Sequence, residues 1–202
     1  MNLEHITYTG PEFDESSNVI ENLPDNLVSL LRQINGFVQY GGGLHLRGVC
    51  NEPEWHSIEN MMNGPISLHN SYTAITDTDI PFAEDCVGDQ FLLRNRNVIK
   101  LLSETGEVEE YGFGLATFLN NAAENPVEFL GMEPLLQLQN EGGELKPGEL
   151  IHVYPPFCTK EAANGVSLKA VPSSEALLYL ADFSKQISGL GEGEQFEVKL
   201  VE

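Results

Sequence analysis

Five carboxylates within thirteen residues give this sequence its clearest capacity for chemistry: Asp77, Asp79, Glu84, Asp85 and Asp89. Such a cluster could bind a divalent cation, act as a general acid and base pair, or contact a basic partner. The spacing lacks the Asp-x-Asp-x-Asp-Gly-x5-Glu order of a calcium loop. Turn formation explains most of the cluster, since aspartate stabilises turns and Gly88 supplies a permissive torsion. Among functional roles, a partner-binding acid patch is preferred to metal binding or catalysis, which need a defined ligand geometry.

Other residue types used in catalysis are scattered along the chain. None of the five histidines has the His-Glu-x-x-His spacing of a zinc site or lies near a cysteine pair. Ser57 follows His56, and Cys86 follows Asp85, but the fold rather than adjacency sets a nucleophile and its base. We therefore expect no catalytic residue, no metal and no cofactor. Trp55 is expected to be a core anchor, with an exposed interface aromatic as the alternative.

The charge balance indicates the class of partner. The 202 residues include 10 Lys plus Arg and 31 Asp plus Glu, for a formal net charge of −21. This charge repels nucleic-acid phosphates and anionic membrane surfaces, so neither is an expected partner. Residues 48–93 hold eight acids and residues 101–145 hold nine, and neither segment contains Lys or Arg. Such a field would attract and orient a basic protein, although acidity also serves solubility.

Cysteine use and the absence of targeting patterns suggest a location. Cys50, Cys86 and Cys158 are odd in number and widely spaced, which supports neither a disulfide framework nor a Cys-x-x-Cys metal site. The N-terminus lacks a basic region followed by an apolar run, and no segment approaches the roughly 18 apolar residues of a membrane span. We expect a cytoplasmic protein of undetermined oligomeric state.

Periodicity predicts helices before and after a glycine-rich turn in the first third of the chain. Leu27, Leu30, Leu31 and Ile34 have helical spacing after Pro24, and Asn35-Gly36 marks the end of that helix. Gly41-Gly42-Gly43 is expected to be a turn before a short strand, because no helix opens directly after it as a phosphate loop requires. A second helix is predicted over 55–62.

A meander of antiparallel strands is predicted from Ile80 onward. Alternating apolar residues mark the strands, and the short turns 94–97 and 104–107 require neighbouring strands to be antiparallel. A helix containing Leu115, Phe118 and Ala122 should end near Asn125-Pro126. Chain 1–125 is thus expected to form an α+β core, a twisted antiparallel sheet with helices packed around it.

Residues 126–202 are expected to extend this core, packed on the same domain. Segment 127–138 is apolar enough for helix but is interrupted by Pro134. Strands are predicted over 150–154, 166–170 and 195–201, with a helix capped by Ser173 between the last two. The extension would therefore be a β-β-α-β unit.

Several short motifs occur in order along the first part of the chain: Leu23-Pro24 to Leu31, Ile34-Asn35-Gly36-Phe37, the segment around Trp55, Phe82-Ala83-Glu84-Asp85 and Gly88-Asp89-Gln90-Phe91, with the meander and helix that follow. Together they resemble the SUKH superfamily, which includes bacterial toxin-immunity proteins and fungal regulators of cell-wall synthesis. The resemblance covers about the first 125 residues. It implies an α+β fold without catalytic machinery, and in bacterial members the covering of a toxin, often a nuclease.

The resemblance and the charge give one functional expectation. A nuclease exposes basic surface to hold a polyanion, and an acidic protein can mask that surface. We therefore expect a non-enzymatic module that binds a basic toxin domain, with the five clustered acids as contacts. The alternatives are a regulatory scaffold of the cell-wall type and a small hydrolase whose two carboxylates face one cleft about 5 to 10 Å apart.

Overall fold

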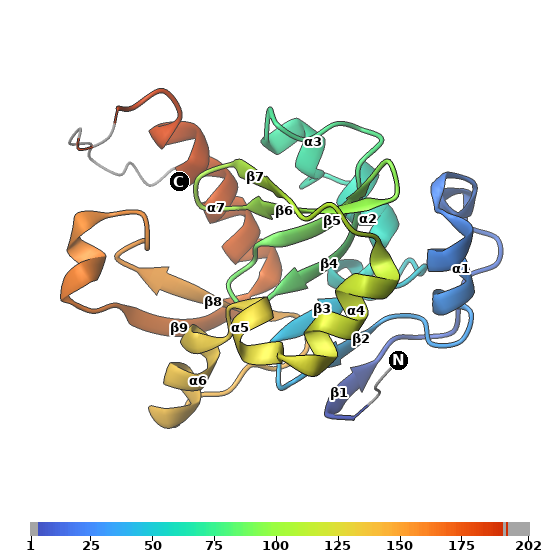
Figure 1. The fold of residues 1–202 in the computed structure, drawn as a ribbon, viewed down its shortest axis with the longest axis horizontal. Helices are drawn as coiled ribbons and strands as arrows, with labels where there is room; N and C mark the ends of the chain where they lie inside the picture. Colours follow the sequence, from blue (N-terminus) through green and yellow to red (C-terminus); the bar gives the residue numbers. More distant parts are fainter. Residues whose placement is uncertain (1–3, 192, 194–202) are drawn as a thin grey trace.

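The structure, a computed structural model, describes residues 4–191 and 193 and has an α+β fold. Its large sheet holds seven antiparallel strands, each paired with its neighbours in sequence (Figure 1). These are β1 (Ile6–Thr9), β2 (Phe37–Gln39), β3 (Leu44–Leu46), β4 (Ile80–Asp85), β5 (Gln90–Arg94), β6 (Asn97–Leu102) and β7 (Glu107–Glu110). A second sheet consists of β8 (Glu149–Tyr154) and β9 (Ser167–Pro172).

Helices surround both sheets. The α-helices are α1 (Asp25–Leu31), α2 (Ile58–Asn63), α3 (Leu68–Ser71), α4 (Leu115–Glu124), α5 (Pro126–Leu130), α6 (Glu133–Asn140) and α7 (Ser173–Ile187). Three short 3-10 helices are η1 (Asn18–Asn22), η2 (Glu54–His56) and η3 (Lys160–Asn164). No helix among the described residues is long and apolar enough to cross a membrane.

The predicted meander is confirmed in β4 to β7. Asn95 and Arg96, between β5 and β6, have φ of 51° and 71°, the positive torsions of a type I′ hairpin turn. In that hairpin Arg94 pairs with Asn97, and Phe91 pairs with Lys100. The short loops therefore fix the register, and register decides which side chains share a face.

The two faces of the large sheet pack against different helices. Phe118 of α4 lies on one face, where its ring contacts Phe82 at 5.2 Å and Phe91 at 4.7 Å between centroids. On the other face, Leu92 and Ile99 pack in one cluster with apolar residues of α7. Figure 1 shows α4 and α7 on opposite sides of the green strands. The sheet is thus covered on both faces, as the apolar character of its strands predicted.

Helix boundaries follow local chemistry, with two corrections, at Pro134 and at Ser173. Ser57 caps α2 by accepting the Asn60 N–H, and Gly64 ends that helix. Pro134 interrupts no helix but lies in the first turn of α6, where proline is tolerated. Ser173, predicted as a cap, is instead the first residue of α7 after Pro172, and its side chain is buried.

The C-terminal extension shares its hydrophobic core with the first 125 residues. One buried cluster joins Phe82 and Phe118 to Ile151 and Val153 of β8. The Ile151 N–H also donates to the carbonyl of Cys86 at 2.8 Å. The β-β-α part of the predicted unit is present, and its last strand, 195–201, lies outside the described residues.

Replacement of Phe118 by alanine tests the packing of α4 on the sheet. The side chain is fully buried among aromatic rings, so Phe118→Ala should lower the free energy of unfolding by about 3–5 kcal/mol. Leu178→Ala is the matched control, because Leu178 is 57% exposed and its replacement should change the free energy of unfolding little. Urea unfolding measures both variants, and equal small losses would show that Phe118 does not hold α4 in place.

Candidate functional site

Glu84 lies inside the large sheet, where a row of polar side chains crosses β3, β4 and β5. The Glu84 carboxylate accepts from Arg47 Nη2 at 2.5 Å and from Gln90 Nε2 at 3.0 Å. Arg47 is fully buried and also donates to Gln90 Oε1 and to the Pro81 carbonyl. Burial alone would raise the pKa of Glu84, but Arg47 and His45 outweigh it and hold that pKa at about 2. Glu84 is therefore an internal counter-ion.

Two histidines continue this row toward α1. Glu84 Oε1 contacts His45 Nδ1 at 2.8 Å, His45 Nε2 contacts His56 Nδ1 at 2.8 Å, and His56 Nε2 donates to the Asn35 carbonyl at 2.9 Å. These three contacts need three protons, whereas two neutral imidazoles supply two. The contact between His45 Nδ1 and Glu84 Oε1 therefore needs one further proton, on the ring or on the carboxyl group. Burial lowers the pKa of His45, and Glu84 opposes that shift.

Glycines allow the chain to pass close to His56. A Cβ on Gly36 would lie 2.6 Å from His56 Cε1, and the φ of Gly36 is 75°. A Cβ on Gly10 would lie 2.3 Å from His56 Nε2. α1 ends at Leu31, before the predicted stop at Asn35-Gly36. That pair instead serves His56, because the Asn35 carbonyl accepts the His56 Nε2–H and Gly36 makes room for the ring.

Asp85 and Asp89 share one lysine at the β4–β5 turn. Lys100 Nζ lies 3.0 Å from Asp85 Oδ2 and 3.0 Å from Asp89 Oδ2. Asp85 Oδ1 also accepts the backbone N–H groups of Val87, Gly88 and Asp89. Burial, then Asp89, raises the pKa of Asp85 to about 7, although Lys100 and the backbone donors oppose that shift. Burial lowers the pKa of Lys100, but the two carboxylates outweigh it and raise that pKa.

Three of the five clustered acids face inward rather than toward a partner. Glu84, Asp85 and Asp79 are 2%, 1% and 4% exposed. Asp79 is bound by Arg94 through two hydrogen bonds of 2.8 and 2.5 Å. The expectation that these three acids contact a partner is therefore wrong. Each carboxylate is buried and forms an ion pair with an arginine or lysine of the same chain. Asp77 is exposed and Asp89 is half-buried.

The interpretation of the cluster as turn chemistry is confirmed for Asp85 and Asp79. Asp85 bonds the backbone of its own turn, and Asp79 Oδ2 accepts the Thr76 N–H at 2.8 Å. Among the described residues, no group of three or more His, Cys, Asp or Glu side chains has the arrangement of a metal site. All three cysteines are free thiols.

A second set of acids lies on the outside of the molecule. We call it the acidic belt; it consists of Glu107, Glu109, Glu110, Glu124, Glu128, Glu133, Glu141 and Glu144, all exposed, and the half-buried Glu104. These are the nine acids of the segment 101–145, which has no Lys or Arg. None of them forms a salt bridge with another described residue. Of the belt acids, Glu110 interacts electrostatically with Arg94 without forming a salt bridge. The belt therefore carries strong negative charge.

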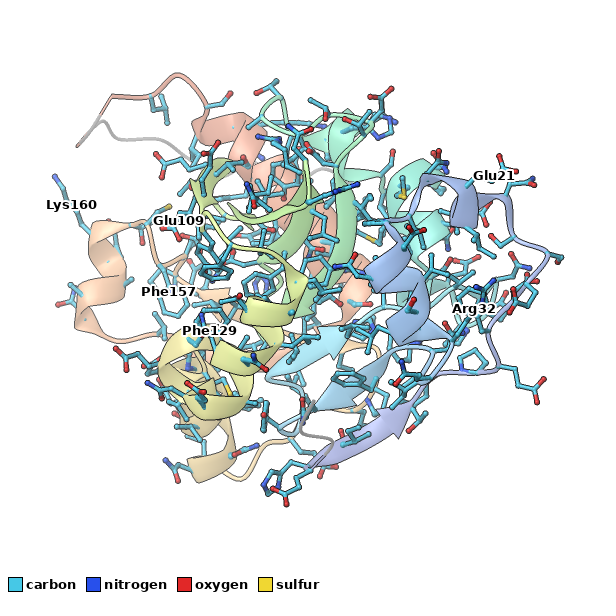
Figure 2. The ribbon with its side chains drawn as sticks, turned by 45° about the vertical axis from the view of Figure 1, so that its right-hand side comes forward. Glu21, Arg32, Glu109, Phe129, Phe157 and Lys160 are labelled. Carbon is cyan, nitrogen blue, oxygen red and sulfur yellow. The ribbon has the colours of Figure 1, made fainter. Side chains whose placement is uncertain are left out.

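An aromatic groove of about 500 Å³ opens within the acidic belt. Tyr111 and Phe113, which follow the edge strand β7, line it together with Phe129 of α5. Glu124 and Glu128 of the belt lie at its rim with Asn121 and Asn125. Figure 2 shows Glu109 and Phe129 on the side of the molecule away from Glu21 and Arg32. This groove combines apolar surface with negative charge.

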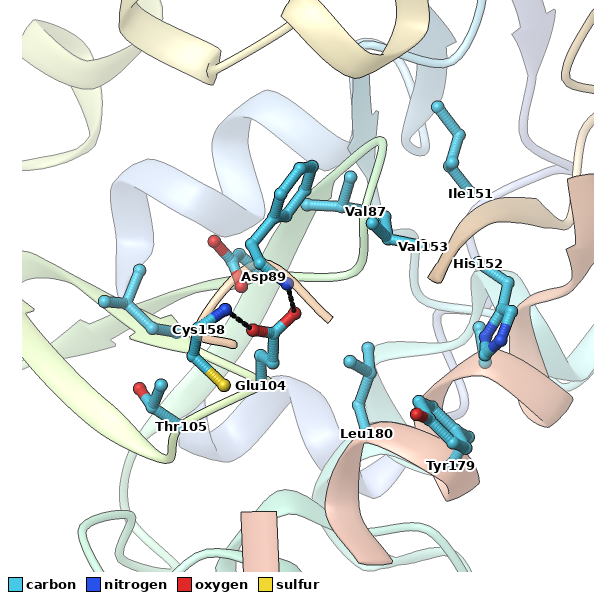
Figure 3. A pocket seen from close by; sticks show the side chains of 13 residues that line it. Val87, Asp89, Glu104, Thr105, Ile151, His152, Val153, Cys158, Tyr179 and Leu180 are labelled. Atoms are coloured by element: carbon cyan, nitrogen blue, oxygen red, sulfur yellow. Dashed lines mark hydrogen bonds between the residues drawn. The ribbon is translucent and has the colours of Figure 1, made fainter. Parts of the chain in front are cut away.

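A separate cavity of about 330 Å³ lies between the end of the large sheet, β8 and α7 (Figure 3). The loop after β8 covers it, held by Glu104, whose oxygens accept the N–H groups of Phe157 at 3.0 Å and Cys158 at 2.5 Å. Asp89 and Tyr179 also line the cavity. Its two acids already have structural partners, because Asp89 binds Lys100 and Glu104 fastens the covering loop.

Trp55 is neither fully buried nor isolated on the surface. It is half-buried, and its ring lies 5.0 Å from His45, 5.1 Å from Tyr8 and 5.4 Å from His56 between centroids. Trp55 therefore shields the histidine pair, a role close to the expected core anchor. Sequence reasoning did not foresee the His45–His56 contact, since eleven residues separate the two rings.

Comparisons with known proteins address the fold. No protein-family model and no curated protein sequence matches the chain. Among solved structures, the chain is similar to the crystal structure of Atu4351 from Agrobacterium tumefaciens, with a TM-score of 0.53 and 12% identity over 89% of this chain and 86% of that one. That coverage reaches well beyond residue 125, so the shared fold includes part of the C-terminal extension.

Removal of Arg47 tests the internal counter-ion role of Glu84. Arg47→Met should lower the free energy of unfolding by about 3–5 kcal/mol, because it leaves a buried carboxylate without its cation. Adding Glu84→Gln should recover part of that loss. Arg32→Met, which breaks the exposed pair with Glu15, is the matched control and should hardly change unfolding. An Arg47→Met loss no larger than the control would contradict the role.

The pH dependence of stability tests the state of His56. Burial, then His45, lowers the pKa of His56 from 6.5 to about 4. Between pH 6.5 and 4, His56 therefore binds a proton in the unfolded chain but not in the folded chain. The free energy of unfolding falls as the pH decreases through this interval, by at most about 3 kcal/mol from this group. His56→Gln should flatten the decline in this interval, measured by urea unfolding from pH 7 to 4. An unchanged decline would assign it to other groups.

Proposed function

We propose that this protein is a non-enzymatic protein-binding module that neutralises a toxin domain by covering a basic surface. The observation that carries the proposal is the acidic belt, nine acids that form no salt bridge with another described residue. The internal acids are neutralised by Arg47, Arg94 and Lys100, so they add little to the outer field. On this proposal the belt takes over the contact role first expected of Asp79, Glu84 and Asp85, and Asp77 and Asp89 stay predicted contacts.

A basic toxin fits this surface for electrostatic reasons. Opposite charge accelerates encounter and orients the two proteins before contact. Enzymes that hold nucleic acid present Lys and Arg around the cleavage site, so a nuclease is the leading candidate for the partner. The resemblance to the SUKH superfamily supports the same class of function. On this proposal the protein acts in the cytoplasm, where it protects the cell that makes it.

Two alternatives use the same molecule differently. A regulatory scaffold, as in the fungal members of that superfamily, would bind through the same belt but to a partner that is not toxic. A small hydrolase would need two carboxylates facing one cleft, and Asp89 and Glu104 do line one cavity. Both have structural partners, however, which favours a role in holding the covering loop.

Neutral variants of the belt test the proposal. The tagged protein is first purified from its native cells at low salt, and each stoichiometric partner is identified and then isolated. The variant with Glu107, Glu109 and Glu110 replaced by Gln should bind the partner at least about tenfold more weakly and with a flatter salt dependence. The matched control replaces Glu12, Glu21 and Asp25, which are exposed and near the other end of the sheet, with the corresponding amides.

The toxin part of the proposal has its own test. Expression of the isolated partner alone should arrest growth, and co-expression of this protein should restore it. A partner without toxicity would favour the regulatory scaffold. Equal affinity of the belt variant and its control would contradict binding through the belt.

A further inference from the structure

The aromatic groove within the belt has the composition of a site for a planar cation. Tyr111 and Phe113 are 5.3 Å apart between ring centroids, and Phe129 lies 5.9 Å from Tyr111 and 6.4 Å from Phe113. All three rings are half-buried, so each retains exposed surface. Ring faces carry negative partial charge and attract cations within about 6 Å of the centroid.

The remainder of the protein already anchors these rings. Phe129 contacts Phe118 of the core at 5.4 Å, and Tyr111 contacts Phe91 of β5 at 6.5 Å between centroids. The Tyr111 N–H donates to Val98 of β6 at 3.1 Å, which fixes the segment after β7 to the sheet. The groove is therefore preformed, and binding would require little ordering of its walls.

Gly112 lies between two of the aromatic residues that line the groove. Its φ is 69°, a left-handed torsion to which glycine is suited, so the chain turns here between Tyr111 and Phe113.

The rim adds full negative charge to the ring faces. Glu124 ends α4 and Glu128 lies in α5, both exposed. Glu128 accepts one hydrogen bond from Asn125 Nδ2 at 2.5 Å and retains further acceptor capacity. No Lys or Arg is among the described residues that line the groove.

We propose that this groove binds an arginine side chain of a basic protein partner, an inference that rests on the proposed function and specifies its contact. A guanidinium is planar, stacks on aromatic faces and donates in pairs to carboxylates, which matches rings and rim together. An ammonium group is compact and strongly hydrated, so lysine uses the rings less well. An uncharged side chain would leave the rim carboxylates without a partner.

Peptides with one altered side chain test the groove directly on the full-length protein. The probes are acetyl-Gly-X-Gly-amide with arginine, lysine or citrulline at X, titrated into isotope-labelled protein and followed by NMR. Arginine should shift the amide signals of Gly112 and Gly114 and the ring signals of Tyr111, Phe113 and Phe129. Lysine should bind more weakly, and citrulline, the neutral isostere, should not bind.

Variants locate the binding and separate it from general attraction. The double variant Glu124→Gln with Glu128→Gln should weaken binding of the arginine peptide about tenfold. The matched control, Glu133→Gln with Glu141→Gln, removes two charges of the belt from residues that do not line the groove. It should weaken binding of the arginine peptide much less. Equal binding of arginine and citrulline peptides, or equal effects of the two double variants, would overturn the proposal.

The native partner distinguishes this inference from the proposed function. Loss of that partner by the Glu124 and Glu128 double variant, but not by its control, supports both. The partner could instead bind this double variant but fail to bind the variant with Glu107, Glu109 and Glu110 replaced by Gln. That result would overturn the arginine site in the groove and leave the proposed function standing. If the arginine peptide binds the groove but the isolated partner is not toxic, the arginine site is supported and the proposed toxin-neutralising function is contradicted.

Discussion

The burial of carboxylates inside a sheet is the constraint on which this structure depends. A buried charge is tolerated only with a counter-ion and hydrogen bonds, and Glu84, Asp79 and Asp85 each have a cation that the fold supplies. Those cations come from β5, β6 and the end of β3. Arg47 and Arg94 reach Glu84 on the neighbouring strand β4 and Asp79 just before it, and Lys100 joins β6 to β4 across β5. Breaking one pair would leave an uncompensated charge in the middle of the sheet.

The same constraint shapes the surface. The chain has ten Lys and Arg, and Arg47, Arg94 and Lys100 serve internal acids. Few cations remain to offset the outer acids, and none lies in the segment 101–145. The inside of the protein is thus balanced while its outside is strongly negative. This separation links the stability of the sheet to the electrostatic field that a partner would meet.

Much of the fold could be predicted from local patterns. The meander followed from alternating apolar residues and short turns, and the presence of α1, α2 and α4 followed from the local sequence pattern. Two helix boundaries did not: α1 ends at Leu31, before Asn35-Gly36, and α2 begins at Ile58, after Trp55. The prediction failed where the partner of a side chain is distant in sequence. Glu84 and Arg47 are 37 residues apart, so no local pattern distinguishes this internal pair from an exposed acid patch.

The aromatic groove was hidden from sequence reasoning for a related reason. Tyr111 and Phe113 follow a strand, Phe129 belongs to a helix after Pro126, and their proximity depends on how α4 packs on the sheet. One signal was available: the absence of Lys and Arg from 101 to 145 marked the segment that forms both the groove and the belt. Charge distribution thus marked a segment whose acids are mostly exposed, whereas the density of acids marked three that are buried.

Hydrogen exchange of the protein alone and in complex with its isolated partner tests the central claim most directly. Binding through the acidic belt predicts slowed amide exchange over β7, α4 and α5, residues 107–130, with little change over residues 12–26. Protection confined to 12–26, or to the loop that covers the cavity, would place the partner elsewhere and contradict the account.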